Sequence, residues 1–297
     1  MATVHKEIWT GEVLRKFRKD NSFLDVIPDR SNLVNNKVIH LVDLGADPDV
    51  LVNNSTYPIG VVDASDSDIP ISLDRFDTEN TGIKDTYLYA ISFDLIGEYT
   101  VQHIESLKEK TADKAIHALA PQTNTATTPV IVTTGATDNG VNARKKITKQ
   151  DILNLKKAFD LAKVPRRGRV LVLCPEHVSQ ILEFDEQFSS QYMNIREGVV
   201  LRLYGFDIYE YTETPVFNAS NAKKAFEAAA APTTDCYSSV AFFAPRMFKA
   251  MGETDMYYRI AKEDPQFRQS TVGFSQYFIC LPKKQEAIGA IVSVAVA

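Results

Sequence analysis

Cys174 and His177 are the pair of residues in this sequence whose types and spacing could support chemistry. A Cys-x-x-His spacing supplies two ligands of a zinc site, and a thiol beside an imidazole can act as nucleophile and base. A zinc site needs about four ligands, however, and the sequence contains no second pair. Cys174 also ends an apolar run that is typical of a buried strand. We therefore predict that Cys174 is a core residue.

Three aspartates, Asp63, Asp66 and Asp68, resemble part of a calcium-binding loop. Their spacing departs from the calcium-loop pattern, and its glycine and distal glutamate are missing. The chain also lacks a Gly-rich phosphate loop ending in Lys-Ser/Thr and a dinucleotide fingerprint after a strand. The five histidines occur singly, which favours solvated or packed roles. The sequence therefore predicts no catalytic, cofactor-binding or metal-binding residues, and no cofactor.

The length of 297 residues suits one large domain or two modest ones. The composition is that of a globular protein, because an apolar content of 44% is ample for a core. A net charge of −5 disfavours free binding to nucleic acid or to an anionic membrane. Three cysteines without paired spacing indicate a reducing compartment. The N-terminus has no apolar signal core, and no apolar run approaches the ~18 residues of a membrane span. We expect a protein made in the cytoplasm, with no membrane partner.

Residues 148–183 predict a helix, a turn, a buried strand and a second helix. Thr148 and Asp151 have the spacing of a capping box, and apolar residues then recur at helical spacing (Ile152, Leu155, Phe159 and Ala162). Pro165 ends this helix because proline disfavours helical backbone in the residue before it. The apolar run 170–174 indicates a strand covered on both faces, and Pro175 begins the next helix.

The remaining elements are predicted from apolar periodicity and from turn residues. A helix over 94–120, capped by Asp94, would be roughly 40 Å long. A short helix is expected over 245–251. Strands are expected over residues 37–44, 69–76, 85–93, 199–203, 206–211, 239–243, 256–261, 274–280 and 287–296.

The order of features in the 148–183 stretch resembles the axial domain of tailed-bacteriophage major capsid proteins. The features are the helix, Val-Pro, Arg-Gly-Arg, the apolar strand, Pro-Glu and the short second helix. The resemblance implies an α+β fold of the Hong Kong 97 coat-protein type. Its parts would be an N-terminal arm (1–34), an extended β-loop with adjoining peripheral strands (35–93), the spine helix of the peripheral domain (94–121), an axial α/β domain (122–251) and returning peripheral strands (252–297).

The same resemblance implies a structural protein rather than an enzyme. Such a protein self-assembles into pentamers and hexamers of an icosahedral head, and the head encloses the double-stranded DNA genome of a tailed phage. The implied partners are further copies of the chain, a scaffolding protein, a portal, decoration or head-completion proteins, and packaged DNA contacted without sequence specificity at the inner surface. The location is then the virion, after assembly in the host cytoplasm. Two alternatives stay open: an encapsulin-like nanocompartment shell, and a cytoplasmic α/β enzyme with a pocket near Cys174 and His177.

Trp9 and Phe17 are candidate contact residues in the arm. They lie on a predicted helix over 4–19 that is too short to bury its own apolar face, and large aromatic residues anchor interfaces when they are desolvated. The alternative is that the arm folds back on its own subunit.

Charge is segregated along the chain. Residues 144–169 contain ten bases against Asp151 and Asp160, whereas residues 40–80 contain nine acids and one base. Opposite patches on one chain suit head-to-tail contact in a closed ring. The resulting interface candidates are Asp63, Asp66 and Asp68 on one subunit and Arg166 and Arg167 on the next. Alternatively, the basic stretch is a solvated helix face or contacts packaged DNA.

Overall fold

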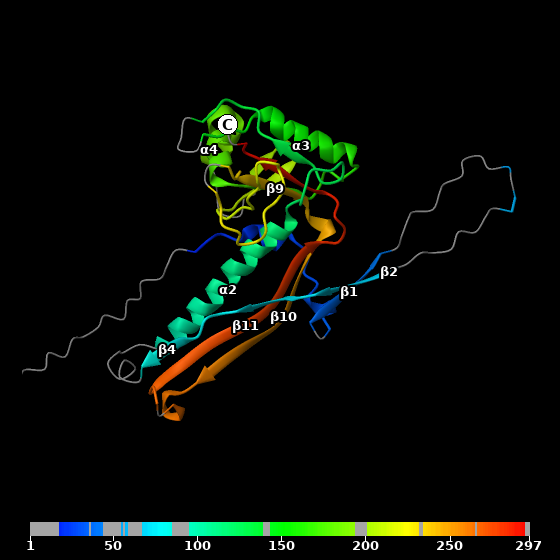
Figure 1. Cartoon of the computed structure of the whole chain (residues 1–297). Coiled ribbons are helices and arrows are strands. Elements are labelled where there is room, and N and C mark those ends of the chain that lie inside the picture. The colour runs from blue at the N-terminus through cyan, green and yellow to red at the C-terminus, as the bar shows by residue number, and fades with distance from the viewer. Residues whose placement is uncertain are drawn as a thin grey trace, which may run out of the picture.

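The structure has a compact part and an elongated part, and one long helix runs from one into the other (Figure 1). It is a computed structural model that describes residues 18–35, 37–43, 55, 57–58, 67–84, 95–138, 143–193, 201–231, 234–264 and 266–294. Among these residues lie a six-stranded mixed sheet, a four-stranded antiparallel sheet and a two-stranded ribbon. Helices beside parallel and antiparallel strands confirm the predicted α+β class.

The long helix α2 (Leu95–Leu119) has 25 residues and is about 37 Å long at 1.5 Å per residue. Its C-terminal half enters the compact part, where Ile116 and Leu119 are fully buried. Its N-terminal half lies along strand β11 (Gln269–Pro282) and packs Leu107 against Val272 and Phe274. The helix predicted over 94–120 is confirmed, whereas its expected cap, Asp94, lies outside the described residues.

The six-stranded sheet forms the centre of the compact part, in the strand order β5-β12-β9-β6-β8-β7. Within it β6 runs parallel to β8 and β12 runs parallel to β5, while the other neighbours are antiparallel. Its strands are β5 (Val130–Val132), β6 (Arg169–Leu173), β7 (Leu201–Leu203), β8 (Phe206–Glu210), β9 (Ser238–Phe243) and β12 (Ile288–Val292).

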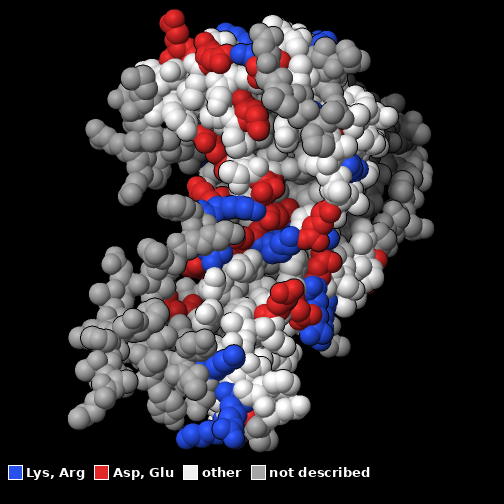
Figure 2. Space-filling view, turned by 60° about the vertical axis from the view of Figure 1, so that its left-hand side comes forward, with Lys and Arg blue, Asp and Glu red and all other residues white. Residues whose placement is uncertain are grey.

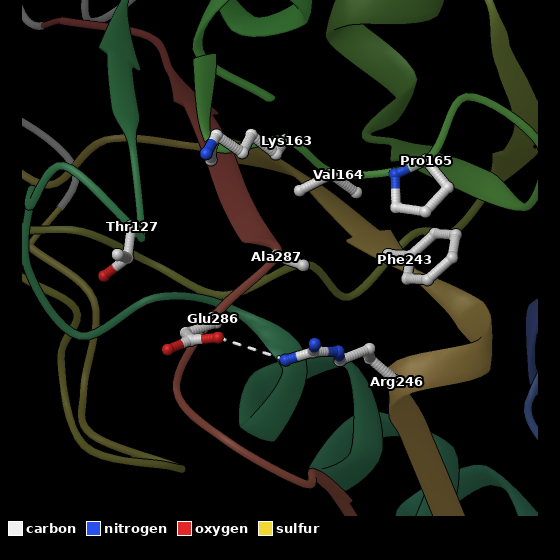
Figure 3. Close-up of a pocket in the computed structure, with 9 residues that line it drawn as sticks. Thr127, Lys163, Val164, Pro165, Phe243, Arg246, Glu286 and Ala287 are labelled. Carbon is white, nitrogen blue, oxygen red and sulfur yellow. Dashed lines mark hydrogen bonds and ion pairs between the residues drawn. The ribbon is translucent and has the colours of Figure 1, made fainter. Parts of the chain in front are cut away.

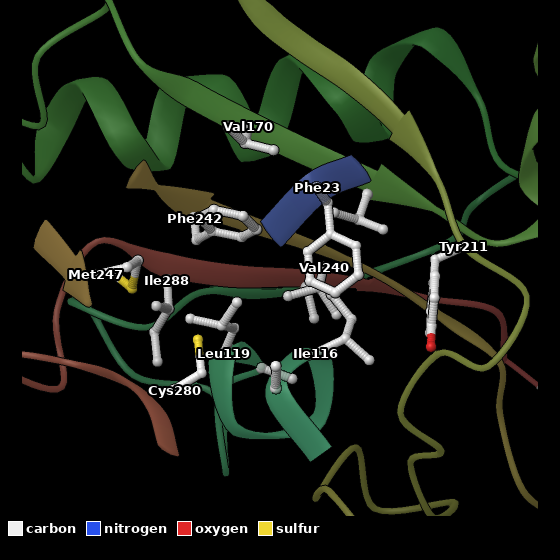
Figure 4. Close-up of a cluster of buried hydrophobic side chains, with 14 of the residues drawn as sticks. Phe23, Ile116, Leu119, Val170, Tyr211, Val240, Phe242, Met247, Cys280 and Ile288 are labelled. Atoms are coloured by element: carbon white, nitrogen blue, oxygen red, sulfur yellow. The ribbon is translucent and has the colours of Figure 1, made fainter. Parts of the chain in front are cut away.

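Both faces of this sheet are covered, which explains the apolar sequence of β6. Val170 and Val172 point into a cluster that contains the end of α2, whereas Leu171 and Leu173 point into a second cluster on the other face. Successive side chains of a strand alternate between faces, so a strand covered on both sides is apolar at each position. Figure 4 shows the first cluster. The helices over the second cluster are α3 (Lys149–Leu161), α4 (Pro175–Phe184) and α5 (Glu186–Met193).

The four-stranded sheet builds the elongated part. β10 (Met247–Arg259) forms one edge and pairs with β11, whose other side pairs with β3 (Asp74–Asp77) and then with β4 (Thr81–Lys84). The ribbon of β1 (Val38–Asp43) and β2 (Ser67–Ser72) extends away from it (Figure 1). Short 3-10 turns complete the fold: η1 (Ser22–Val26), η2 (Ser31–Leu33), η3 (Ala244–Arg246) and η4 (Ala261–Glu263).

Several local predictions are confirmed. Thr148 and Asp151 form the capping box at the start of α3, and Pro175 occupies the first turn of α4. The strands predicted over 199–203 and 206–211 correspond to β7 and β8, which form a hairpin, and both of its turn residues, Tyr204 and Gly205, have positive φ. This backbone conformation is typical of two-residue hairpins, because it matches the twist of the flanking strands.

Other predictions are wrong or incomplete. The helix predicted over 245–251 is only the turn η3, after which β10 begins at Met247. The strand predicted over 287–296 as part of the peripheral domain is β12, which lies in the six-stranded sheet, because its side chains are buried on both faces. Strands β4 and β5 and helix α5 were not predicted. The strand expected over 85–93 lies outside the described residues.

The segment predicted as an N-terminal arm is partly a core segment. Phe23, Leu24 and Ile27 are buried in the same cluster as the end of α2 (Figure 4 labels Phe23). The ring of Phe23 meets that of Tyr211 edge to face, with centroids 5.1 Å apart. Residues 23–27 therefore belong to the compact part by packing.

Candidate functional site

The Cys174 and His177 side chains are buried and have structural roles in the core. His177 Nδ1 lies 2.6 Å from Ser239 Oγ, and His177 Nε2 lies 2.6 Å from Ser293 Oγ. Desolvation lowers the pKa of His177 to about 4, and it raises the pKa of the Cys174 thiol to about 12. The neutral imidazole of His177 is hydrogen-bonded to both hydroxyls and so links α4, β9 and the segment after β12. The core role predicted for Cys174 is confirmed, and the pair gives no support to the enzyme alternative.

Besides one small pocket, the described residues form two wider and more open hollows, of about 410 Å³ beside Ala120 and about 620 Å³ beside His103. The described residues contain no group of three or more histidine, cysteine or acidic side chains that could hold a metal ion. Figure 3 shows a small pocket of about 100 Å³ beside Val164, crossed by an ion pair of 3.1 Å between Arg246 and Glu286. This volume is below the ~300–1,000 Å³ of ordinary ligand pockets. No helix in the described ranges is long and apolar enough to span a bilayer.

Arg169 anchors the turn that displays the predicted basic contact residues. Its side chain is 2% exposed, and its Nη2 atom lies 2.7 Å from Asp160 Oδ1. The guanidinium also donates hydrogen bonds to the carbonyl oxygens of Val164 and Pro165. The hydrogen bond from Arg169 lowers the pKa of the Asp160 carboxyl. A buried arginine whose donors are used in this way holds the chain between α3 and β6 in one conformation.

Arg166 and Arg167 are exposed on this anchored turn. Lys145, Lys149 and Lys157 are exposed nearby in the sequence and on α3. The basic stretch is smaller than its ten residues suggested, because Arg144 and Arg169 are buried. Lys146 is partly neutralised as well, since its Nζ lies 2.8 Å from Glu183 Oε2. The available positive charge is thus concentrated on α3 and the turn after it.

Of the acidic candidates, only Asp68 lies within the described residues. It is exposed on β2, and its Oδ2 atom lies 2.8 Å from Nδ1 of His40 on β1. The structure does not bring Asp68 together with Arg166 or Arg167 in one chain. Trp9, Phe17, Asp63 and Asp66 lie outside the described residues.

An exposed apolar cluster that the sequence analysis missed lies at the end of the elongated sheet. Its five members are between 41% and 63% exposed: Met256, Tyr257, Tyr258, Ile260 and Phe267. Consecutive strand residues point to opposite faces, so exposure of all three β10 members means that neither face is covered there. The sequence signal was three apolar residues in succession, which were interpreted only as a strand.

The cluster is held on an ordered turn. Asp264 is buried, pairs with Arg259 and accepts a hydrogen bond of 3.2 Å from the backbone N–H of Phe267. Ser270 Oγ accepts a hydrogen bond of 3.2 Å from the backbone N–H of Ala261. These bonds fix the connection between β10 and β11, so its exposed side chains form a preorganised surface.

Comparison with known proteins identifies the family. The model of the phage capsid protein family matches residues 81–291, which is more than half of the chain. The chain therefore belongs to the phage capsid protein family. Comparison with curated proteins gave no match.

Solved structures agree in fold. The capsid of a native GTA particle is 12% identical, covers 98% of this chain and 95% of its own, and has a TM-score of 0.70. The capsid of cyanophage P-SCSP1u is 18% identical, with coverages of 99% and 94% and a TM-score of 0.65. That of cyanophage Pam1 is 13% identical, with coverages of 100% and 99% and a TM-score of 0.65.

The predicted phage capsid fold is confirmed by this likeness. Together with the family, it makes the chain a major capsid protein whose place is the virion shell. Neither the family nor the fold comparisons favour the enzyme alternative.

Replacing Arg169 tests the anchored turn. Arg169→Met should lower the free energy of unfolding by about 2–4 kcal/mol, because two carbonyl oxygens and Asp160 lose their buried donor. The same change at exposed Arg167 should cost less than about 0.5 kcal/mol. Chemical denaturation of both variants measures the difference. Equal stabilities would show that Arg169 does not anchor the turn.

His177 should make the subunit acid-sensitive. Its pKa is about 4 in the fold and 6.5 without shift, so its contribution is complete above pH 6.5 and is lost as the pH falls towards 4. Between pH 7.5 and 5.0 this group should account for about 2 kcal/mol of lost stability. Denaturation of the wild type and of His177→Gln at both pH values isolates that difference. An NMR titration that places the pKa of His177 near 6.5 would contradict the assignment.

Proposed function

We propose that this capsid protein assembles into pentamers and hexamers of an icosahedral head that encloses the double-stranded DNA of a tailed phage. The observation that supports assembly most directly is the exposed cluster of Met256, Tyr257, Tyr258, Ile260 and Phe267. Methionine and aromatic side chains are enriched in protein interfaces, where their burial supplies much of the binding energy. We propose a neighbouring copy of the chain as the partner that covers this cluster.

The backbone beside the cluster is available for pairing as well. Residues 28–31 cover the outer edge of β10 as far as Met251: Arg30 N–H donates to the Lys249 carbonyl at 2.8 Å, and Met251 N–H donates to Ser31 Oγ at 2.8 Å. Beyond that point, none of the described residues pairs with the outer edge of residues 252–259. An open strand edge next to apolar side chains favours contact with another chain.

A second proposed contact joins oppositely charged surfaces in a ring. Arg166 and Arg167 on the anchored turn would meet Asp63, Asp66 and Asp68 of the next subunit. Exposed pairs contribute only ~0–1 kcal/mol each, so the attraction must come from many pairs per ring and must weaken with salt. A solvated surface and a contact with packaged DNA remain the alternatives for these basic residues.

We also propose a division of the chain into parts. Residues 1–34 form an arm with Trp9 and Phe17 as contacts, 35–93 the extended loop, 94–121 the spine, 122–251 the axial domain and 252–297 the periphery. β12 departs from this division, because it pairs within the six-stranded sheet. A scaffolding protein, a portal, decoration proteins and DNA bound without sequence specificity are proposed from the family alone, as is a role without catalysis.

Charged substitutions in the apolar cluster should block assembly without unfolding the subunit. We expect Tyr257→Glu with Phe267→Glu to reduce shell yield at least about tenfold, because two carboxylates would be desolvated in the contact. Phe184→Glu, at an exposed aromatic residue on α4, serves as the control and should assemble normally. Sucrose-gradient sedimentation and negative-stain microscopy measure the yield. Normal shells from the double variant, with an unchanged melting temperature, would reject this surface.

Charge reversal tests the ring contact independently. Arg166→Glu with Arg167→Glu should slow assembly at low salt, since like charges then face each other. Adding Asp63→Lys, Asp66→Lys and Asp68→Lys in the same chain should partly restore the rate. Light scattering at 50 and 500 mM salt follows both reactions. If the combined variant assembles no better than either set alone, the two surfaces do not meet.

A further inference from the structure

Residues 18–27 are attached to the subunit by two different forces. From Phe23 to Ile27 the attachment is apolar, because both side chains are buried in the cluster at the end of α2. Before Phe23 the attachment is ionic. Figure 2 shows a belt of interleaved acidic and basic side chains across the middle of one face of the molecule.

The ionic attachment is made mainly by Arg18 and Lys19 on one row of carboxylates, and Lys19 Nζ also lies 3.8 Å from Glu213 Oε1. Glu105, Glu109 and Asp113 are four residues apart on α2 and therefore share one face of the helix. Arg18 Nε lies 3.0 Å from Glu105 Oε2, and Arg18 Nη1 lies 3.2 Å from Glu109 Oε2. Lys19 Nζ lies 3.1 Å from Asp113 Oδ2. The backbone N–H of Lys19 also donates to Glu109 Oε1 at 3.2 Å.

A local turn separates the two attachments. Asp20 accepts hydrogen bonds from the backbone N–H of Ser22 at 3.0 Å and from its hydroxyl at 3.1 Å. The turn is closed by residues 20–22 alone, so it can persist whether or not residues 18 and 19 stay on α2. The ionic attachment can then open without disturbing Phe23.

One carboxylate of the row keeps a hydrogen-bond partner when residues 18 and 19 leave α2. Asp113 Oδ1 accepts a hydrogen bond of 2.6 Å from Tyr211 Oη, so Asp113 keeps a partner when Lys19 leaves. Glu105 and Glu109 are bound only by residues 18 and 19 within the described part of the chain. The paired side chains are partly buried, between 16% and 31% exposed, so salt weakens these pairs less than it would weaken fully exposed ones, whereas it does not screen the buried apolar contacts at all.

We propose that Arg18 and Lys19 form a releasable ionic latch, which is closed on α2 in the free subunit and opens when its charges are screened or displaced. The buried side chains of Phe23, Leu24 and Ile27 are the permanent anchor behind the latch. The latch goes beyond the proposed assembly contacts, because it is a property of the single subunit.

Limited trypsin digestion of the full-length, unassembled protein tests the latch. Trypsin cleaves after Arg18 and Lys19, and cleavage requires that these residues leave α2. Raising NaCl from 50 to 500 mM should speed these two cleavages about fivefold, after correction with a small peptide substrate. Glu109→Gln should speed them about fivefold already at 50 mM. Glu253→Gln, at an exposed glutamate of β10, is the matched control and should behave as the wild type.

Mass spectrometry of the fragments gives the rate at each bond, and thermal melting confirms that each variant stays folded. Cleavage that is slow and insensitive to both salt and Glu109→Gln would overturn the latch, because the apolar anchor alone would then hold the segment. Rapid cleavage of the wild type at 50 mM NaCl would overturn it as well. Failure of shell assembly in any variant does not affect this readout.

Discussion

The continuity of α2 is the constraint on which the rest of the structure depends. One end of this helix fills the core beneath the six-stranded sheet through Ile116 and Leu119. The rest of the helix supports β11, through Leu107 at its middle and Ile96 in its first turn. Because this helix serves two cores, and because Met247 of β10 and Cys280 of β11 share the first of them, the compact and elongated parts cannot move independently without breaking hydrogen bonds of α2 or one of these packed faces. The elongated sheet can therefore extend far from the compact part and still be held in a fixed direction.

The two parts differ in how completely they bury their own surface. β6 is covered on both faces, so the compact part is stabilised within one chain. The far half of β10 is exposed on both faces, and none of the described residues pairs with its outer edge, so its apolar side chains are suited to burial against another molecule. This division suits a shell subunit, since a rigid folded unit presents surfaces that become stable only in the assembly. The family and the fold comparisons reach the same function by an independent route.

Sequence patterns predicted the elements whose local signals agree with their packing. The capping box of Thr148 and Asp151 predicted the start of α3, Pro175 predicted the start of α4, and the apolar run that begins at Val170 predicted β6. These predictions succeeded because caps, proline and two-sided burial leave local signals in the sequence. The patterns failed where distant contacts decide. β12 looks like any apolar terminal strand, yet pairing with β9 and β5 places it in the other sheet. The role of Arg169 could not be predicted, since a basic stretch does not reveal which of its charged side chains is buried. The exposed cluster could not be predicted either, since an apolar strand does not reveal which of its side chains stay exposed.

Hydrogen–deuterium exchange of the free subunit and of the assembled shell tests the central claim most directly, because it reports burial of each backbone segment. The six-stranded sheet and the C-terminal half of α2 should be protected in both states, since their burial is complete within one chain. The backbone N–H groups of residues 252–259 that point away from β11 should exchange rapidly in the free subunit and become protected in the shell. Equal protection of that segment in both states would contradict the account, because its edge and apolar side chains would then have no part in joining subunits.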